Sequence, residues 1–158
     1  ACILNAVELV NNQMRNSHID VEFILDESIP GIYGDNLSLE QLFINLILNS
    51  RDAITARKEG SDAPAGKIKI MTGANDHHAW LIIEDNGCGI PEDIIPKIWT
   101  PFFTTKRKGK GTGIGLSLSH RIIKEHNAEV SVDSSGNGTV FTITFPLEQT
   151  VSYTANEE

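Results

Sequence analysis

The sequence predicts an α/β (α+β) two-layer sandwich, in which several strands form a sheet and three long helices pack on one face of it. Three observations lead to this prediction. Apolar residues recur at helical spacing in residues 3–16, 37–58 and 113–126, and short strand-like runs lie between and after these segments. With 158 residues, of which 40% are apolar and 22% charged, the chain has the length and composition of one globular domain with a single core.

Five short apolar runs separate or follow the helical segments and predict the strands of the sheet. They occupy residues 21–25, 67–70, 79–84, 130–132 and 140–145. The last two are joined by the turn-forming residues 133–138, which predict a hairpin. Beyond Pro146 the sequence is polar and acidic without a pattern. We therefore expect one domain over residues 1–146 and a flexible tail over residues 147–158.

The helix predicted at residues 37–58 is apolar over most of its circumference but carries one polar line. Its members are three or four residues apart and fall within a sector of about 80°. They are Ser38, Gln41, Asn45, Asn49 and Asp52. Between leucines these groups need a polar partner, because unpaired burial is costly; the alternative is a narrow solvated stripe. Glu40 and Arg51 lie well round the helix and are the better candidates for its solvent face, and Asp35 or Ser38 is placed to cap its start.

The stretch from Asp85 to Leu116 indicates a purine nucleotide site. It opens with a carboxylate at a strand end, followed by Gly87 and Gly89, and it closes on glycines that alternate from 109 to 115 before the last helix. A carboxylate there can accept a hydrogen bond from an exocyclic amino group, which adenine has, and the glycines leave room for a flat base. The free N–H groups and positive dipole end of the following helix suit phosphate.

The basic residues of this stretch support a polyanionic ligand. Four of the 13 lysines and arginines lie between Lys106 and Lys110, in a chain whose net charge is −8; the alternative is a solvated loop. Alternating glycines beside these cations predict a mobile lid. The sequence has no P-loop motif, dinucleotide-binding glycine pattern or protein-kinase catalytic loop. The acidic balance argues against nucleic acid or an anionic membrane as the main partner.

Asn49 presents a hard oxygen to a cation. Mg²⁺ keeps several waters and takes one or two protein oxygens together with substrate phosphates, so a single Asn suffices if a nucleotide supplies the rest.

Cysteine content and hydropathy indicate a reducing, cytoplasmic setting. Cys2 and Cys88 are too few and too far apart in sequence for a disulfide framework, and the chain has neither a long apolar run nor a signal peptide. The chain begins in what reads as the middle of a protein. We therefore expect an excised domain, whose full-length parent can still carry a membrane anchor.

Taken in order, the polar line of the long helix, the Asp85-to-Gly89 box, the Phe102-Phe103 box and the glycine ladder resemble the ATP-binding catalytic domain of bacterial sensor histidine kinases. That superfamily also includes DNA gyrase, a heat-shock chaperone and mismatch-repair ATPases. The resemblance extends from about Ile3 to Pro146, and the short segment before Gly111 is similar to the lid of nitrogen-regulation-type kinases. It implies the Bergerat fold, with a mixed sheet of about five strands on three helices, and transfer of the γ-phosphoryl group of Mg-ATP to a histidine.

The resemblance also implies roles for single residues. Asn49 matches the magnesium ligand of the family, Asp85 the residue that reads adenine, and Thr139 a residue near the base. The implied catalytic residues are Asn45, Asn49 and Lys106. The residues implied to contact ATP, or ADP as product, are Asn49, Asp52, Asp85, Gly87, Gly89, Ile90, Phe103, Thr104, Thr105, Lys106, Gly111, Thr112, Gly113, Ile114, Gly115, Leu116 and Thr139.

Asn45 separates phosphoryl transfer from hydrolysis. It precedes Asn49 by one helical turn, where the hydrolytic relatives carry a Glu that activates water, and an amide cannot take a proton at neutral pH.

None of the five histidines has the acidic residue, Arg and Pro of a phosphoacceptor motif, and Asn127-Ala128 replaces the family's usual Gly-Gly after His126.

The partners implied are therefore a phosphoacceptor and dimerisation domain of the same or a paired kinase and a downstream response regulator. We expect this fragment to be monomeric. The alternatives are a serine-directed anti-sigma-type kinase and a non-catalytic nucleotide-sensing module of the same fold.

Overall fold

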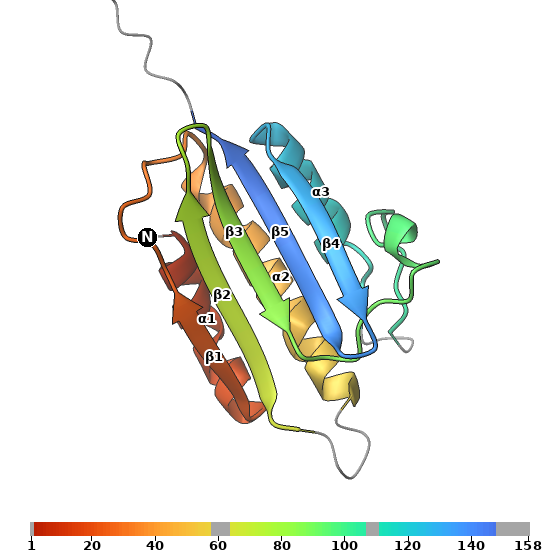
Figure 1. The fold of residues 1–158 in the computed structure, drawn as a ribbon. Helices are drawn as coiled ribbons and strands as arrows, with labels where there is room; N and C mark the ends of the chain where they lie inside the picture. Colours follow the sequence, from red (N-terminus) through yellow and green to blue (C-terminus); the bar gives the residue numbers. More distant parts are fainter. Residues whose placement is uncertain (1, 58–63, 107–110, 148–158) are drawn as a thin grey trace, which may run out of the picture.

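The computed structural model describes residues 2–57, 64–106 and 111–147, and within these ranges three helices cover one face of a five-stranded sheet (Figure 1). The helices are α1 (Cys2–Asn16), α2 (Asn36–Arg57) and α3 (Gly115–Glu125), with a short 3₁₀ helix η1 (Ile95–Lys97). The strands, in spatial order, are β1 (Ile19–Ile24), β2 (Gly66–Ala74), β3 (His78–Asp85), β5 (Gly138–Pro146) and β4 (Glu129–Ser135).

The pairing of the strands is mixed. β1 runs parallel to β2, whereas β2, β3, β5 and β4 are joined by antiparallel ladders. The two-layer sandwich, its mixed five-stranded sheet and the three helices on one face are thus confirmed. Residues 148–158 of the predicted tail lie outside the described residues.

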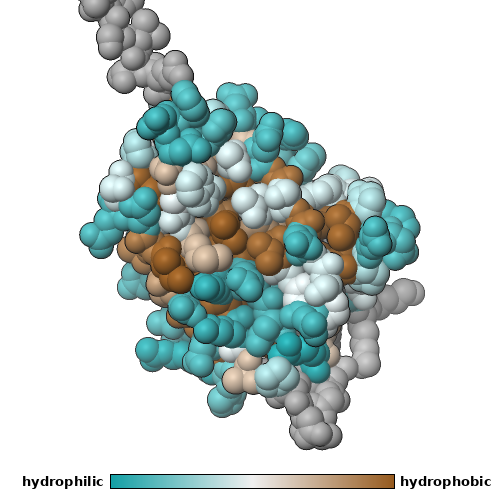
Figure 2. All heavy atoms as spheres, viewed as in Figure 1, coloured by the Kyte–Doolittle hydropathy of each residue, from teal (hydrophilic) through white to brown (hydrophobic). Residues whose placement is uncertain are grey.

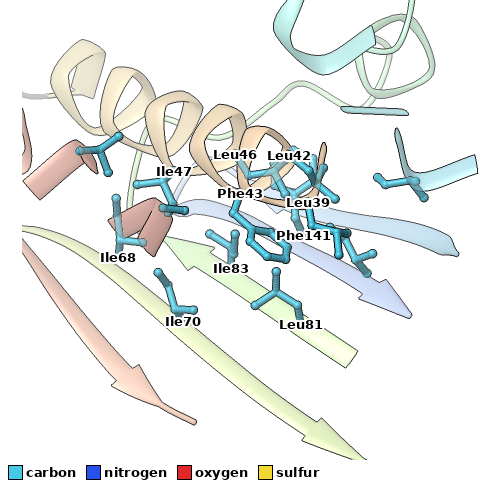
Figure 3. Packing of buried hydrophobic residues seen from close by; sticks show 14 of the residues in the cluster. Leu39, Leu42, Phe43, Leu46, Ile47, Ile68, Ile70, Leu81, Ile83 and Phe141 are labelled. Atoms are coloured by element: carbon cyan, nitrogen blue, oxygen red, sulfur yellow. The ribbon is translucent and has the colours of Figure 1, made fainter. Parts of the chain in front are cut away.

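The core lies between α2 and the middle of the sheet. Leu42, Leu46, Ile47 and Ile54 of α2 are fully excluded from solvent. They pack on the side chains that alternate residues of β2, β3 and β5 turn towards the helices (Figure 3). The labelled strand residues are Ile68, Ile70, Leu81, Ile83 and Phe141.

α2 begins at an N-cap that the sequence left open between two residues. The carboxylate of Asp35 accepts a hydrogen bond from the backbone N–H of Ser38 at 2.8 Å, so Asp35 is the cap. Hydrogen bonding by Ser38 holds the pKa of Asp35 below its usual value. Asp35 also donates its backbone N–H to Nε2 of His126, at the end of α3, at 3.1 Å, which ties the start of α2 to α3.

The prediction that Glu40 and Arg51 form the solvent face of α2 was wrong, because α1 packs along that side. Glu40 accepts a hydrogen bond from Asn5 of α1 at 2.9 Å. Arg51 contacts Gln13 of α1, and its guanidinium also pairs with Asp52. A single helix cannot reveal which of its polar faces a neighbouring helix will cover.

The other face of the sheet has no helix on it in the described ranges, and a mixed surface of polar and apolar residues is visible there (Figure 2). Ile24, Met71 and Ile82 stand side by side on β1, β2 and β3. Trp80 covers Gly73, where an added Cβ would lie 2.5 Å from the indole ring. Among the described residues no helix is long and apolar enough to cross a membrane.

Replacing the fully buried Leu46 by Ala should lower the free energy of unfolding by about 3 kcal/mol, because it leaves a cavity between α2 and the sheet. Leu37→Ala on the same helix is the matched control, since that side chain is 75% exposed and should cost far less. Urea denaturation followed by circular dichroism measures both. Equal losses in the two variants would contradict the described packing of α2.

Candidate functional site

The carboxylate of Asp85 is buried at the end of β3. The residue is 5% exposed, and its Oδ1 accepts the backbone N–H of Gly87 at 2.8 Å. Thr139 of β5, 3% exposed, lies directly opposite in the sheet. Burial raises the pKa of Asp85 despite the opposing hydrogen bonds, chiefly from Gly87, and the more distant charge of Arg57. A buried carboxylate of this kind gains from a ligand that donates a hydrogen bond to it.

Ser50 of α2 is a further polar group beside this carboxylate. Its side chain is 1% exposed, and its Oγ has no partner that meets hydrogen-bond geometry among the described residues. It nevertheless stands close enough to Asp85 to help lower the pKa of that carboxyl. An unpartnered buried hydroxyl next to a buried carboxylate marks a place where a polar ligand or water can bind. Sequence reasoning missed this residue, because a serine inside a helix carries no functional signal of its own.

The two glycines after Asp85 are required by protein contacts. A Cβ on Gly87 would lie 2.6 Å from Cβ of Ala53 in α2. Gly89 has a φ of +73°, and its Cβ would lie 1.7 Å from the carbonyl oxygen of Ser135 in β4. The loop that holds Gly87 and Gly89 therefore packs closely between α2 and the β4–β5 hairpin. The sequence predicts that these glycines leave room for a base; the structure shows that they also leave room for close packing against α2 and β4.

Ser134 of β4 ties this loop to the hairpin. Its Oγ accepts the backbone N–H of Ile90 at 2.8 Å and lies 2.9 Å from Oγ1 of Thr139. It also donates to the carbonyl of Gly138 at 3.1 Å. Ser134 thus positions two predicted site residues at once. Sequence reasoning missed it because a serine before a glycine turn reads as a turn residue.

Asn45 connects α2 to the start of α3. Its Nδ2 donates to the carbonyl oxygen of Gly115 at 3.2 Å and lies 3.4 Å from the hydroxyl of Ser119, while its Oδ1 accepts from Gln41 at 2.9 Å. This amide therefore holds the last glycine of the ladder against α2.

Asn49 and Asp52 lie next to a lysine from the segment before the glycine ladder. Nζ of Lys106 lies 2.5 Å from Oδ2 of Asp52 and 3.4 Å from Oδ1 of Asn49. The other oxygen of Asp52 accepts from Arg51. The polar line of α2 thus has polar partners rather than forming a solvated stripe. Amide and carboxylate oxygens are ligands that suit a hard cation, and the ammonium of Lys106 shows that a positive charge is accommodated beside them.

Phe102, of the aromatic box, and Gly113, of the glycine ladder, are joined by a backbone hydrogen bond. Phe102 donates its backbone N–H to the carbonyl of Gly113 at 2.9 Å. Both residues have positive φ, +66° and +68°, and a Cβ on Gly113 would lie 2.4 Å from the Phe102 carbonyl carbon. The side chain of Phe102 is 76% exposed. Left-handed backbone at a non-glycine residue costs free energy and is typical of functional segments.

For the remaining predicted site residues, the structure gives their exposure and one close approach. Gly111 lies against Thr104, where an added Cβ would be 2.8 Å from its Oγ1. Thr105, Thr112 and Ile114 are exposed, whereas Phe103 and Leu116 are half-buried. Residues 107–110, which include the other three basic residues between Lys106 and Lys110, lie outside the described residues. Two groups of polar side chains therefore lie along α2: the candidate base end, at Asp85 of β3 beside Ser50, and the candidate cation end, at Asn49 beside Asp52 and Lys106.

Comparison with known proteins adds sequence relatives to this geometry. The family model described as "Histidine kinase-, DNA gyrase B-, and HSP90-like ATPase" matches residues 34–149. Sporulation kinase E of Bacillus subtilis is 36% identical over 156 residues, which are 98% of this chain and 20% of that protein. The signal transduction histidine-protein kinase AtoS of Escherichia coli is 38% identical over 149 residues, 93% of this chain and 23% of that protein. The chain thus spans about a fifth of the length of these curated relatives.

Solved structures share the fold. The nucleotide-free catalytic domain of histidine kinase ThkA has a TM-score of 0.76 and 32% identity, with 92% of this chain and 91% of that chain covered. ThkA in complex with response regulator protein TrrA has a TM-score of 0.72 and 29% identity, with 92% of this chain and 39% of that chain covered.

The raised pKa of Asp85 predicts a pH-dependent stability. The folded state binds a proton at Asp85 more tightly than the unfolded state, so this contribution to stability is present below the usual carboxyl pKa of about 4 and is lost as pH rises through the folded pKa. Asp85→Asn does not titrate. Its free energy of unfolding, relative to the parent, should therefore increase as pH rises from about 4 to about 7 in urea denaturation.

Asp35→Asn supplies the contrast. The pKa of Asp35 is lowered in the folded state, so the stability it contributes is present at neutral pH and is lost as pH falls through the folded pKa. The stability of this variant relative to the parent should decrease as pH rises. Two variants that respond to pH in the same direction would contradict the environments described for the two carboxyl groups.

Proposed function

We propose, from the premise that this chain belongs to the family of histidine kinase-, DNA gyrase B- and HSP90-like ATPases, that it is the ATP-binding catalytic domain of a sensor histidine kinase. In this proposal it delivers the γ-phosphoryl group of ATP to a histidine on a separate phosphoacceptor domain. One observation carries the proposal: α2 lies beside the buried carboxylate of Asp85 through Ser50, and directly before Ser50 it carries Asn49, whose Oδ1 lies 3.4 Å from the ammonium of Lys106. Histidine kinases of known name and fold along nearly the whole chain support it.

The base end is suited to adenine. Asp85 accepts hydrogen bonds but donates none when ionised, so it matches the exocyclic amino group of adenine and opposes a carbonyl at the same position. Ser50 and Thr139 supply hydroxyl groups beside it, either of which can donate to or accept from a ring nitrogen or an intervening water. The raised pKa of Asp85 fits this role, because a ligand N–H compensates the buried charge.

The phosphate end is supported by charge and backbone. α3 begins at Gly115, shortly after Gly111 and Gly113, and its first turn supplies N–H groups with the positive end of a helix dipole. The ammonium of Lys106 lies 3.4 Å from Oδ1 of Asn49 and can neutralise phosphate oxygens during transfer. Asn49 would hold Mg²⁺ through Oδ1 together with the nucleotide phosphates, and the metal would supply further charge neutralisation.

Transfer is favoured over hydrolysis by Asn45. Both ends of its amide are engaged, by Gln41 and by the first turn of α3, and an amide offers no base for a water molecule. The acceptor is then a histidine supplied from outside the chain, and a response regulator is the downstream partner by analogy with the ThkA–TrrA complex. A serine-directed kinase and a nucleotide sensor remain the competing functions, and an acceptor screen with a transfer assay separates them.

Asp85→Asn should weaken ADP binding by about 1–3 kcal/mol, because the amide can turn its NH₂ towards the amino group of the base. Isothermal titration calorimetry measures this. The control is Glu84→Gln, which removes the neighbouring charge from an exposed residue on the opposite face of β3. Unchanged ADP affinity in Asp85→Asn would remove this residue from the site.

The isolated chain should not phosphorylate itself on histidine but should label a separately supplied helical phosphoacceptor domain. It has the groups that hold phosphates but none of its histidines has the acceptor context. Radiolabelled ATP is incubated with the chain alone and with its cognate acceptor domain. Acid-labile label on the isolated chain, or rapid phosphate release without an acceptor, would overturn the proposal.

A further inference from the structure

We propose that the ammonium group of Lys106 is an internal cation that occupies the position beside Asn49 before nucleotide binds, and that Asp52 is the positioning residue that holds it there and releases it to the phosphates. This inference rests on the proposed function, because it assigns a binding sequence to the same site. It explains why a carboxylate, which repels phosphate, stands one helical turn from the expected metal ligand.

The contacts of Lys106 are unequal. Its Nζ lies 2.5 Å from Oδ2 of Asp52, the distance of a strong charged hydrogen bond, but 3.4 Å from Oδ1 of Asn49. The side chains of Lys106 and Asp52 are 35% and 26% exposed, so the pair is partly shielded from water. Asp52 is therefore the main anchor of the lysine, and Asn49 is the oxygen that it covers.

A metal ion and this ammonium compete for the same oxygen. Mg²⁺ binds protein oxygens at about 2.0–2.1 Å, so a metal on Asn49 Oδ1 would stand within about 5.5 Å of an ammonium 3.4 Å from that atom. Two cations at that separation repel each other unless an anion lies between them. Lys106 must therefore leave Asn49 or share a phosphate group with the metal when the site fills.

Asp52 can release Lys106 without being left unpaired. Its Oδ1 accepts from both Nε and Nη2 of Arg51, at 2.8 Å and 2.5 Å, independently of the lysine on Oδ2. Arg51 is held in turn by Gln13 of α1. The carboxylate thus keeps one charged partner from α2 itself while its second partner moves to the nucleotide. Asp52 can therefore hold Lys106 before nucleotide binds and release it afterwards, which a fixed structural ion pair would not do.

The Lys106–Asp52 pair can either supply a counter-cation to the nucleotide or only support the fold. The two roles predict different changes in metal-free nucleotide affinity when each residue is replaced. If Lys106 serves as the counter-cation, its loss weakens nucleotide binding most when metal is absent. Loss of the Asp52 charge frees the lysine and removes a phosphate-repelling group, so it strengthens metal-free binding. A pair that only supports the fold would make both substitutions act in the same direction, through stability.

The experiment measures ADP affinity by calorimetry, once with EDTA and once with excess Mg²⁺. We expect Lys106→Met to weaken metal-free ADP binding about tenfold and Mg-ADP binding less, the size of one lost charged hydrogen bond. We expect Asp52→Asn to strengthen metal-free binding about threefold or more, since a charge that opposes phosphate is gone. Arg121→Met and Glu125→Gln, an exposed ion pair on α3, are controls with the same charge changes and should leave both affinities unchanged.

The outcomes separate the two proposals. If the parent chain binds no ADP under either condition, the proposed function falls, and this inference falls with it. If the parent binds ADP but Lys106→Met and Asp52→Asn weaken metal-free binding alike, or change nothing, only the inference is overturned.

Thermal melts check whether each variant folds. Should Asp52→Asn fail to fold, Lys106→Arg decides: it keeps the charge, so metal-free affinity should stay close to that of the parent, and a loss as large as in Lys106→Met contradicts the inference.

Discussion

The close packing of α2 on the sheet is the constraint on which the rest of the molecule depends. Its leucines and isoleucines fill the space above β2, β3 and β5, and at one point Ala53 approaches the loop so closely that only Gly87 fits opposite. This contact fixes the height of Asp85 relative to the helix. Asn49 precedes Ala53 by four residues, about 6 Å along the axis. The spacing between the base end and the cation end is thus set by helix geometry.

Much of the fold was predictable because it depends on local patterns. Helical spacing identified α1, α2 and α3, apolar runs identified the five strands, and the glycine turn identified the β4–β5 hairpin. Several site features were also visible. The polar line of α2 and the carboxylate at Asp85 were recognisable because a polar group at an otherwise apolar position needs a partner.

What the sequence could not predict depends on which elements become neighbours. Arg51 faces α1, and Ser134 holds Ile90, because distant segments meet there. Neither contact leaves a local signature, since serine and arginine are common on surfaces. The glycines show the same limit: their positions were predictable, but the reason for Gly89 is a carbonyl of Ser135 that no sequence pattern reveals.

Asn45 shows how packing and chemistry constrain each other at one residue. Its amide donates to the carbonyl of Gly115, and that contact holds the start of α3 against α2. A carboxylate of the hydrolytic relatives could not make this contact, because an ionised carboxylate has no donor and would face the carbonyl oxygen as a second acceptor. In the proposed function, the residue that offers no base to water is therefore also the one that holds the start of α3 in place. If an acidic residue replaced Asn45 in this chain, the start of α3 would have to pack against α2 through a different contact.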